Sequence, residues 1–213
     1  MPKKIVEYNV TIPKIKKAKN QERGFIMAAT ANTAVSLSSS YYLRSFYKSN
    51  RDATTDSKRK ELSKGTLSKA DAEALRTAVR KLRNFNMEDD TDEGANIYSS
   101  VSAFLETYNN ALDSSSHSND YSLNRYAKQL KNLAKEYADE LKDIGVTVKS
   151  DGTLEKNDNL LKSAKVSNIK KLFGKDAEFT TKTSNYAKRI NTKAADLIYS
   201  ELTQTGQNVN WLG

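Results

Sequence analysis

The sequence predicts a mainly α-helical fold, an antiparallel helical bundle or coiled coil with a small β-hairpin insert. Three observations lead to this prediction. Apolar residues recur at spacings of three and four through most of the second half of the chain. The two prolines are Pro2 and Pro13, so the residue that most reliably breaks a helix is missing from everything after them. Between residues 145 and 155, alternating valines and an Asp-Gly pair interrupt the helical pattern and indicate a hairpin.

Composition and charge divide the chain into three segments. With 213 residues, 37% of them hydrophobic, the chain is long enough to build a sizeable core. Residues 1–64 contain 14 Lys and Arg against 5 Asp and Glu, and the remainder contains 21 of each sign. The net charge of +9 therefore resides in the first segment. We predict a basic, loosely patterned N-terminal segment over 1–64, a helical bundle over 65–203 and a polar C-terminal tail over 204–213.

The N-terminal segment shows little sustained periodicity. Pro13 follows a short alternation that predicts a β-strand, made by Val6, Tyr8, Val10 and Ile12. The serine-rich run at 36–42 ends in two tyrosines and fits neither a helix nor a strand. We therefore predict no helix before residue 65.

The first predicted helix begins at Ser68, where Asp71 completes an imperfect capping box. Its apolar stripe consists of Leu75, Val79 and Leu82. The acidic run at 88–93 follows. Because this run lacks the alternating ligands and the closing glutamate of an EF-hand, we interpret it as a charged linker and not as a calcium loop.

The second predicted helix starts at Ile97 and ends in a serine-rich loop at 113–119. Steps of four and three residues connect the apolar positions Ile97, Val101, Phe104, Tyr108 and Leu112. The loop contains the single histidine, His117. No acid or nucleophile motif surrounds it, so we predict a plain loop residue and not a catalytic one.

The third predicted helix has the most regular pattern, which is typical of a coiled coil or an antiparallel helix pair. Its stripe extends over three heptads and consists of Leu123, Tyr126, Leu130, Leu133, Tyr137, Leu141 and Ile144. The charged residues between them, such as Glu136 and Lys135, predict ion pairs within the helix. Gly145 ends the helix as a C-terminal glycine does.

Two short helices and one long helix complete the predicted bundle. A hairpin formed by Val146, Val148, Asp151, Gly152 and Leu154 precedes them. Asn157 or Asp158 caps the first short helix and Ser167 the second. The long helix begins near Glu178 and gives way to the polar tail after residue 203.

The residue types also bear on function classes. The chain contains no cysteine, no glycine-rich phosphate loop and no cluster of metal-ligating side chains, so we predict no enzyme, no cofactor and no metal site. No continuous apolar stretch follows the basic start, which argues against a cleaved secretory signal. The mildly apolar region 25–47 is interrupted by polar residues and Arg44, which argues against a membrane span.

A protein of this kind acts through a surface and not through a pocket. The residues predicted for an interaction surface belong to the heptad helix and the last long helix; they are Leu123, Leu130, Tyr137, Leu141, Ile190 and Leu197. The alternative is that these side chains pack inside one chain, because a bundle must first bury its own apolar faces.

The order of several short motifs resembles a known family. A helix carries Val101, Phe104 and the pair Tyr108-Asn109, and the heptad helix follows it. Next come, in order, Ile144-Gly145-Val146, Asp151-Gly152-Thr153-Leu154, Asn157-Asp158 and Leu172-Phe173-Gly174. In this order and spacing, residues 95–190 resemble the C-terminal helical region of the bacterial flagellar filament cap, or hook-associated cap, proteins.

The chain departs from that family in two respects. Lys156 and Asn157 stand where the family has an apolar residue and a capping aspartate. The family's opening segment and its large β-rich middle domains have no counterpart in this sequence. These departures leave open whether the chain has the family's role or shares its helical module alone.

The resemblance implies a structural protein of a bacterial appendage that acts by helix packing and oligomerisation. Its partner would be itself or another helical appendage subunit, and it would reach the exterior by export without a cleaved signal. One alternative is a helical export chaperone that stays in the cytoplasm. The other is sequence-independent nucleic-acid binding through a basic arm consisting of Lys14, Lys16, Lys17, Lys19, Lys58, Arg59 and Lys60.

Overall fold

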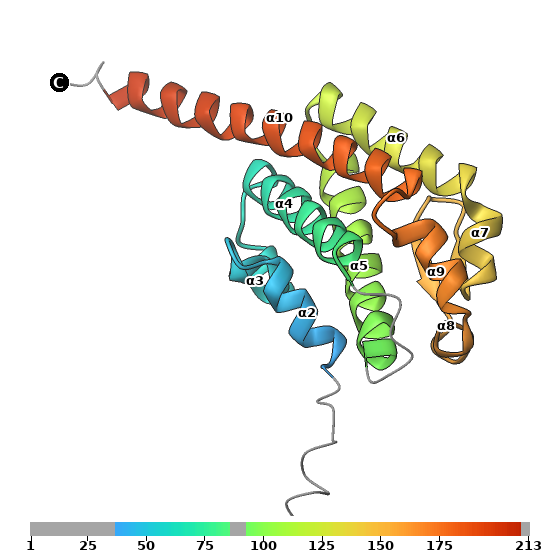
Figure 1. The fold of residues 1–213 in the computed structure, drawn as a ribbon. Coiled ribbons are helices and arrows are strands. Elements are labelled where there is room, and N and C mark those ends of the chain that lie inside the picture. Colours follow the sequence, from blue (N-terminus) through green and yellow to red (C-terminus); the bar gives the residue numbers. More distant parts are fainter. Residues whose placement is uncertain (1–36, 86–92, 210–213) are drawn as a thin grey trace, which may run out of the picture. The chain divides into compact units, whose positions relative to one another are not determined.

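The computed structural model describes residues 37–85 and 93–209, which are mainly helical with one small antiparallel sheet (Figure 1). The predicted fold class is thereby confirmed. The strand predicted at residues 6–12, the acidic run at 88–92 and the last residues of the predicted tail lie outside the described residues.

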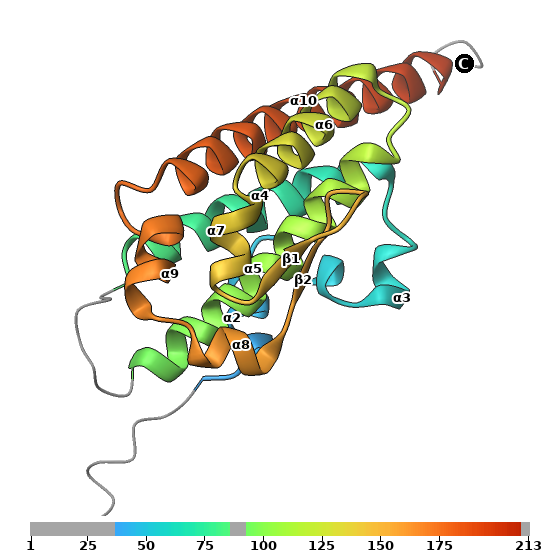
Figure 2. The ribbon, with the colours of Figure 1, turned by 90° about the vertical axis from the view of Figure 1, so that its right-hand side faces the viewer.

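Four long helices pack around a common core. They are α4 (Lys64–Arg83), α5 (Glu93–Ser116), α6 (Tyr121–Glu136) and α10 (Glu178–Val209). Helix α4 packs against α5, α5 against α6, α6 against α10 and α10 against α4, so the contacts close into a ring (Figure 2). Each helix therefore buries an apolar stripe against two neighbours, as in a four-helix bundle.

Two helices correct the prediction that no helix precedes residue 65. They are α2 (Ser39–Phe46) and α3 (Asp56–Arg59), with a 3₁₀ turn at Arg51–Thr54 between them. The Ser38 side chain caps α2 by accepting a hydrogen bond from the backbone N–H of Tyr41. Helix α2 packs against α4 and α5 and buries Phe46. Because α2 is about two turns long, its apolar positions are too few to show a helical period in the sequence.

Helix α4 begins four residues earlier than predicted. Ser63 and not Ser68 is its cap, accepting from the backbone N–H of Thr66. Ser68 is buried in the second turn, where its hydroxyl donates to the carbonyl of Ser114 at 3.0 Å. Asp71 is likewise buried and forms no capping box.

The predicted heptad helix is broken at Tyr137 into α6 and α7 (Ala138–Asp143). Tyr137 has φ −105° and ψ 24°, outside the helical region. The backbone N–H of Leu141 donates a hydrogen bond to the Tyr137 carbonyl at 2.9 Å, so α7 begins directly after the break. Glu136 pairs with Lys182 of α10 at 2.9 Å, so an ion pair between helices replaces the predicted pairing within one.

The predicted hairpin is present as β1 (Val146–Val148) and β2 (Leu154–Lys156), with Val148 opposite Leu154. Gly152 in the turn has φ +91°, which favours glycine. The Asn109 side chain on α5 accepts from the backbone N–H of Leu154 at 2.8 Å and donates to its carbonyl at 2.9 Å. These two hydrogen bonds fix the hairpin against α5. The hairpin crosses α5 in Figure 2.

Two short helices follow, α8 (Asp158–Ser163) and α9 (Val166–Phe173). Of the two candidate caps of α8, Asn157 and Asp158, the cap is Asn157, which accepts from two backbone N–H groups at 3.1 Å. Ser167 does not cap α9, since that helix starts at Val166 after a residue with no side-chain cap.

Three phenylalanines form the centre of the core. The Phe104 and Phe173 ring centroids are 5.0 Å apart and edge-to-face, and Phe179 lies 6.0 Å from Phe173 and 6.2 Å from Phe104. They come from α5, α9 and α10, so the cluster joins the hairpin side of the bundle to its last helix.

Helix α10 corrects the position of the predicted tail. The helix continues to Val209, although the polar composition after residue 203 predicts a tail. Its C-terminal part extends beyond α4 and α6 in both views (Figures 1 and 2).

Candidate functional site

Four of the six residues predicted for an interaction surface are buried in the core of the single chain. Leu123, Leu130, Leu141 and Ile190 are each 0% exposed. These four side chains therefore pack inside the single chain, which is the alternative to an interaction surface, and they are not accessible to a second chain.

The other two predicted residues are partly buried. The Tyr137 hydroxyl donates to Glu178 at 3.1 Å, and its ring lies 5.3 Å from that of Phe179. Burial, followed by the hydrogen bond to Glu178, raises the pKa of Tyr137. Leu197 packs against the edge of the core from α10. The six residues thus form no continuous exposed surface.

A serine, a histidine and an aspartate lie together at the end of α5, but their geometry is not that of a catalytic triad. Both Ser116 and Asp113 approach the same ring nitrogen, Nδ1 of His117, at 3.5 and 3.0 Å. A triad needs the nucleophile on one ring nitrogen and the acid on the other. The side chains of His117 and Asp113 are also 76% and 63% exposed, so water surrounds the group.

A buried ion pair connects α3 to α4. The Arg59 guanidinium donates to both carboxylate oxygens of Asp71, at 2.7 and 2.9 Å. The Tyr47 hydroxyl donates to the same carboxylate at 2.7 Å and accepts from the Asn110 amide at 3.0 Å. Burial alone would lower the pKa of Arg59, but the hydrogen bonds and charge of Asp71 outweigh burial and raise it. With every partner satisfied, this network stabilises the fold and holds no accessible reactive group.

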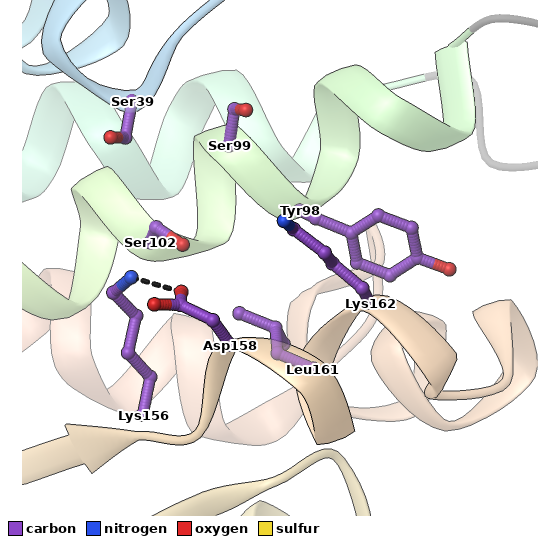
Figure 3. Close-up of a pocket in the computed structure, with 8 residues that line it drawn as sticks. All are labelled: Ser39, Tyr98, Ser99, Ser102, Lys156, Asp158, Leu161 and Lys162. Atoms are coloured by element: carbon purple, nitrogen blue, oxygen red, sulfur yellow. Dashed lines mark hydrogen bonds and ion pairs between the residues drawn. The ribbon is translucent and has the colours of Figure 1, made fainter.

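A polar hollow of about 610 Å³ lies between α5, α8 and the ends of β2 and α2 (Figure 3). Lys156 and Asp158 form an ion pair in it, and Lys162 extends from α8 toward α5. Three serines complete its polar lining, namely Ser39, Ser99 and Ser102. The bond and charge of Lys156 lower the pKa of Asp158. A carboxylate whose pKa is lowered in this way is a weaker general base than a free one.

A second hollow, of about 770 Å³, lies between α2 and α4 and is strongly basic. A smaller one of about 230 Å³ adjoins it, and Arg80 and Glu73 line both. We call the two together the basic groove; its cations are Arg44, Lys48, Arg51, Arg76, Arg80 and Lys81. Sequence reasoning missed it, although Arg76 and Arg80 are four residues apart and thus share a face of α4.

The residues predicted for a nucleic-acid-binding arm are not those of the groove. Lys58 pairs with Glu61 at 3.2 Å, and Arg59 is held by Asp71. Lys60 is exposed directly after α3, and the other lysines of the predicted arm, Lys14, Lys16, Lys17 and Lys19, lie outside the described residues. Of the predicted arm, only Lys58, Arg59 and Lys60 are described, and none of them lines the groove.

The end of α10 is the clearest exposed apolar feature. Gly65, in the first turn of α4, lies against Ile198; a Cβ atom built on Gly65 would lie 3.2 Å from Ile198 Cγ1. Tyr199 and Leu202, beyond that point, are 71% and 66% exposed. Since α4 begins at Lys64, the apolar stripe of α10 continues past the helix that covers it.

Within residues 37–85 and 93–209, no group of three or more acidic or histidine side chains is arranged to hold a metal ion. Among the helices described there, none combines the length and the apolar character that crossing a membrane requires. Comparison with protein-family models, with curated proteins and with solved structures finds no match to this chain.

Proposed function

We propose that the chain is a structural subunit that assembles through the C-terminal end of α10. The observation that carries this proposal is that the apolar stripe of α10 continues beyond the N-terminal end of α4, the helix that covers it. Ile198 lies over Gly65 at the start of α4, and Leu202 is one turn, about 6 Å, further along. Large apolar side chains exposed together on one helix are typical of a protein interaction surface.

The proposed occupant of this surface is a second copy of the chain. Tyr199 and Leu202 are three residues apart, so they share one exposed face of α10. Two such faces in antiparallel contact would place Leu202 of each copy against Tyr199 of the other, which is the self-complementary arrangement of a two-fold dimer.

The appendage role rests on the resemblance to flagellar filament caps. The resembling motifs fall on α5, on the turn after α7, on the hairpin, on the cap of α8 and on the end of α9. Of these elements, α9 contacts α10 directly, and the heptad helix α6, which the resemblance also includes, packs along α10. The resemblance therefore covers part of the bundle that supports the proposed assembly surface. We therefore place the subunit in a bacterial appendage, exported without a cleaved signal.

Association is tested by the molar mass of the full chain in light scattering over a range of concentrations. The wild type is expected to approach twice the monomer mass of 23.8 kDa, and Tyr199→Lys/Leu202→Lys to remain monomeric. Leu160→Lys is the matched control, since Leu160 is also an exposed large apolar residue (56%) but lies on α8. A dimer that persists in the double variant, or a wild type that is monomeric at every concentration, would overturn the proposal.

The location is tested by quantifying the protein in cytoplasm, culture medium and sheared appendages of the native bacterium, beside a strain that lacks flagellar export. Export-dependent appearance outside the cell is expected. Strict retention in the cytoplasm would contradict the appendage role and favour an export chaperone.

A further inference from the structure

We propose that the basic groove binds single-stranded nucleic acid without sequence preference, a function separate from assembly through α10. Six cationic side chains line the groove: three from the α2 side, Arg44, Lys48 and Arg51, and three from α4, Arg76, Arg80 and Lys81. Five of the six line the larger hollow, and Arg76 extends the positive charge of α4 into the smaller one, which Ser184 of α10 also lines. A hollow lined by positive charge from two elements is an arrangement that follows a phosphate backbone.

The groove's positive charge is not neutralised within the described part of the chain. None of its six cations forms an ion pair with a carboxylate there. The acidic residue that lines the groove, Glu73, is already engaged: it accepts from the Ser49 hydroxyl at 3.1 Å and pairs with Lys69 at 3.8 Å. Concentrated charge of one sign raises the local concentration of oppositely charged ligands, so the groove attracts an anionic polymer.

The lining favours phosphates over an acidic helix from another protein. Four of the six cations are arginines, whose planar guanidinium groups bind phosphate oxygens in pairs. A docking helix would need apolar anchor pockets. Phe46 is 2% exposed and supplies none, whereas the exposed Tyr41 ring, at 50%, offers a base a surface for stacking.

The two walls of the groove are held together, which preorganises the site. Tyr47, directly after α2, donates to Asp71 on α4 at 2.7 Å, and Ser49 donates to Glu73, two residues further along α4, at 3.1 Å. Both bonds join the α2 side to α4. The cations therefore start from a fixed spacing, and binding does not have to order the backbone.

The test is fluorescence anisotropy of a labelled 20-nucleotide oligo-dT strand with the full chain. The wild type is expected to bind with a log–log salt slope of about −3 to −4, since each of four to six phosphate contacts to a single strand contributes about −0.7. Arg44→Glu/Arg80→Glu should weaken binding at least about tenfold and reduce the magnitude of the slope by about 1 to 2.

The matched control is Lys135→Glu/Lys142→Glu. It makes the same change in net charge at exposed lysines of α6 and α7, away from the groove, and should bind about as the wild type does. Equal weakening by both double variants, or no weakening by either, would overturn the proposal. So would binding of labelled poly-glutamate as tight as that of oligo-dT, because the groove would then be recognising charge alone.

A folding defect is excluded by circular dichroism, with Lys48→Gln/Arg51→Gln as a milder second variant that should also weaken binding. The surface variant Tyr199→Lys/Leu202→Lys should bind oligo-dT normally. Failure of assembly and failure of strand binding are therefore distinguishable.

Discussion

At the scale of single residues, buried polar groups account for much of what fixes α2 and α3 on the bundle. Asp71 accepts from Arg59 and Tyr47 and is 0% exposed, so these three side chains join segments that local sequence patterns do not connect. The sequence places Asp71 at a helix start, where capping is the ordinary role of an aspartate. Its partners are 12 and 24 residues away, a separation that periodicity cannot reveal.

Asp71→Asn is expected to lower the free energy of unfolding by about 3 kcal/mol, because it leaves the Arg59 charge largely buried without its counter-ion. Urea unfolding followed by circular dichroism measures the loss. Replacing both partners by apolar residues, in Arg59→Met/Asp71→Leu, should restore much of the stability. If the single variant cost less than about 1 kcal/mol, the pair would contribute little to the fold.

Two buried tyrosines predict sensitivity to alkali. Burial, followed by the Asp71 charge, raises the pKa of Tyr47 well above its ordinary 10.0, and burial raises that of Tyr108. Below pH 10 both hydroxyls are protonated in the folded and the unfolded chain. Above it the unfolded chain alone releases these protons, so the free energy of unfolding falls by about 1.4 kcal/mol per pH unit for each tyrosine.

Urea unfolding between pH 8 and pH 11 measures this dependence, and Tyr108→Phe provides the comparison. The variant should lose less stability between pH 10 and pH 11 than the wild type, by about the share of one tyrosine. Parallel curves for the two proteins would show that Tyr108 ionises as readily in the folded chain.

At the scale of elements, periodic stripes predict the long helices well because each of these helices buries one face along most of its length. The hairpin and the cap of α8 are also predicted correctly, since Gly152 and Asn157 act through local backbone chemistry. The break at Tyr137 is missed because the heptad spacing continues through it, and both sides of the break still bury their leucines. Helix α2 is missed because it is too short for a period.

The turn at Gly145 requires glycine. Its φ of +78° is unfavourable for other residues, and an added Cβ would lie 2.5 Å from Leu160 Cβ and 2.8 Å from the Leu161 backbone nitrogen. Gly145→Ala should therefore destabilise the chain by more than the ~1–2 kcal/mol of a left-handed backbone alone.

Gly152→Ala is the comparison for that variant, because its added Cβ would lie close to Cγ and Cβ of the Lys131 side chain, at 2.5 and 2.8 Å, while the nearest backbone atom, Lys131 Cα, is 3.2 Å away. Both variants are measured by urea unfolding. A smaller loss of stability for Gly145→Ala than for Gly152→Ala would contradict this account of the turn.

At the scale of the whole molecule, the bundle buries the residues that sequence reasoning assigned to an interaction surface. A heptad pattern has the same appearance whether its partner helix belongs to the same chain or to another, so the sequence could not decide between the two. The features that remain outside the core are the end of α10 and the basic groove. Both depend on where α4 lies relative to its neighbours, which no local pattern encodes.

The measurement that tests assembly through α10 most directly is thiol cross-linking at position 199. The chain contains no cysteine, so Tyr199→Cys introduces a single thiol, and Leu160→Cys does the same on α8. We predict that a short bismaleimide joins two Tyr199→Cys chains into a covalent dimer and leaves Leu160→Cys monomeric. Equal cross-linking of the two variants, or none at position 199, would contradict the central claim.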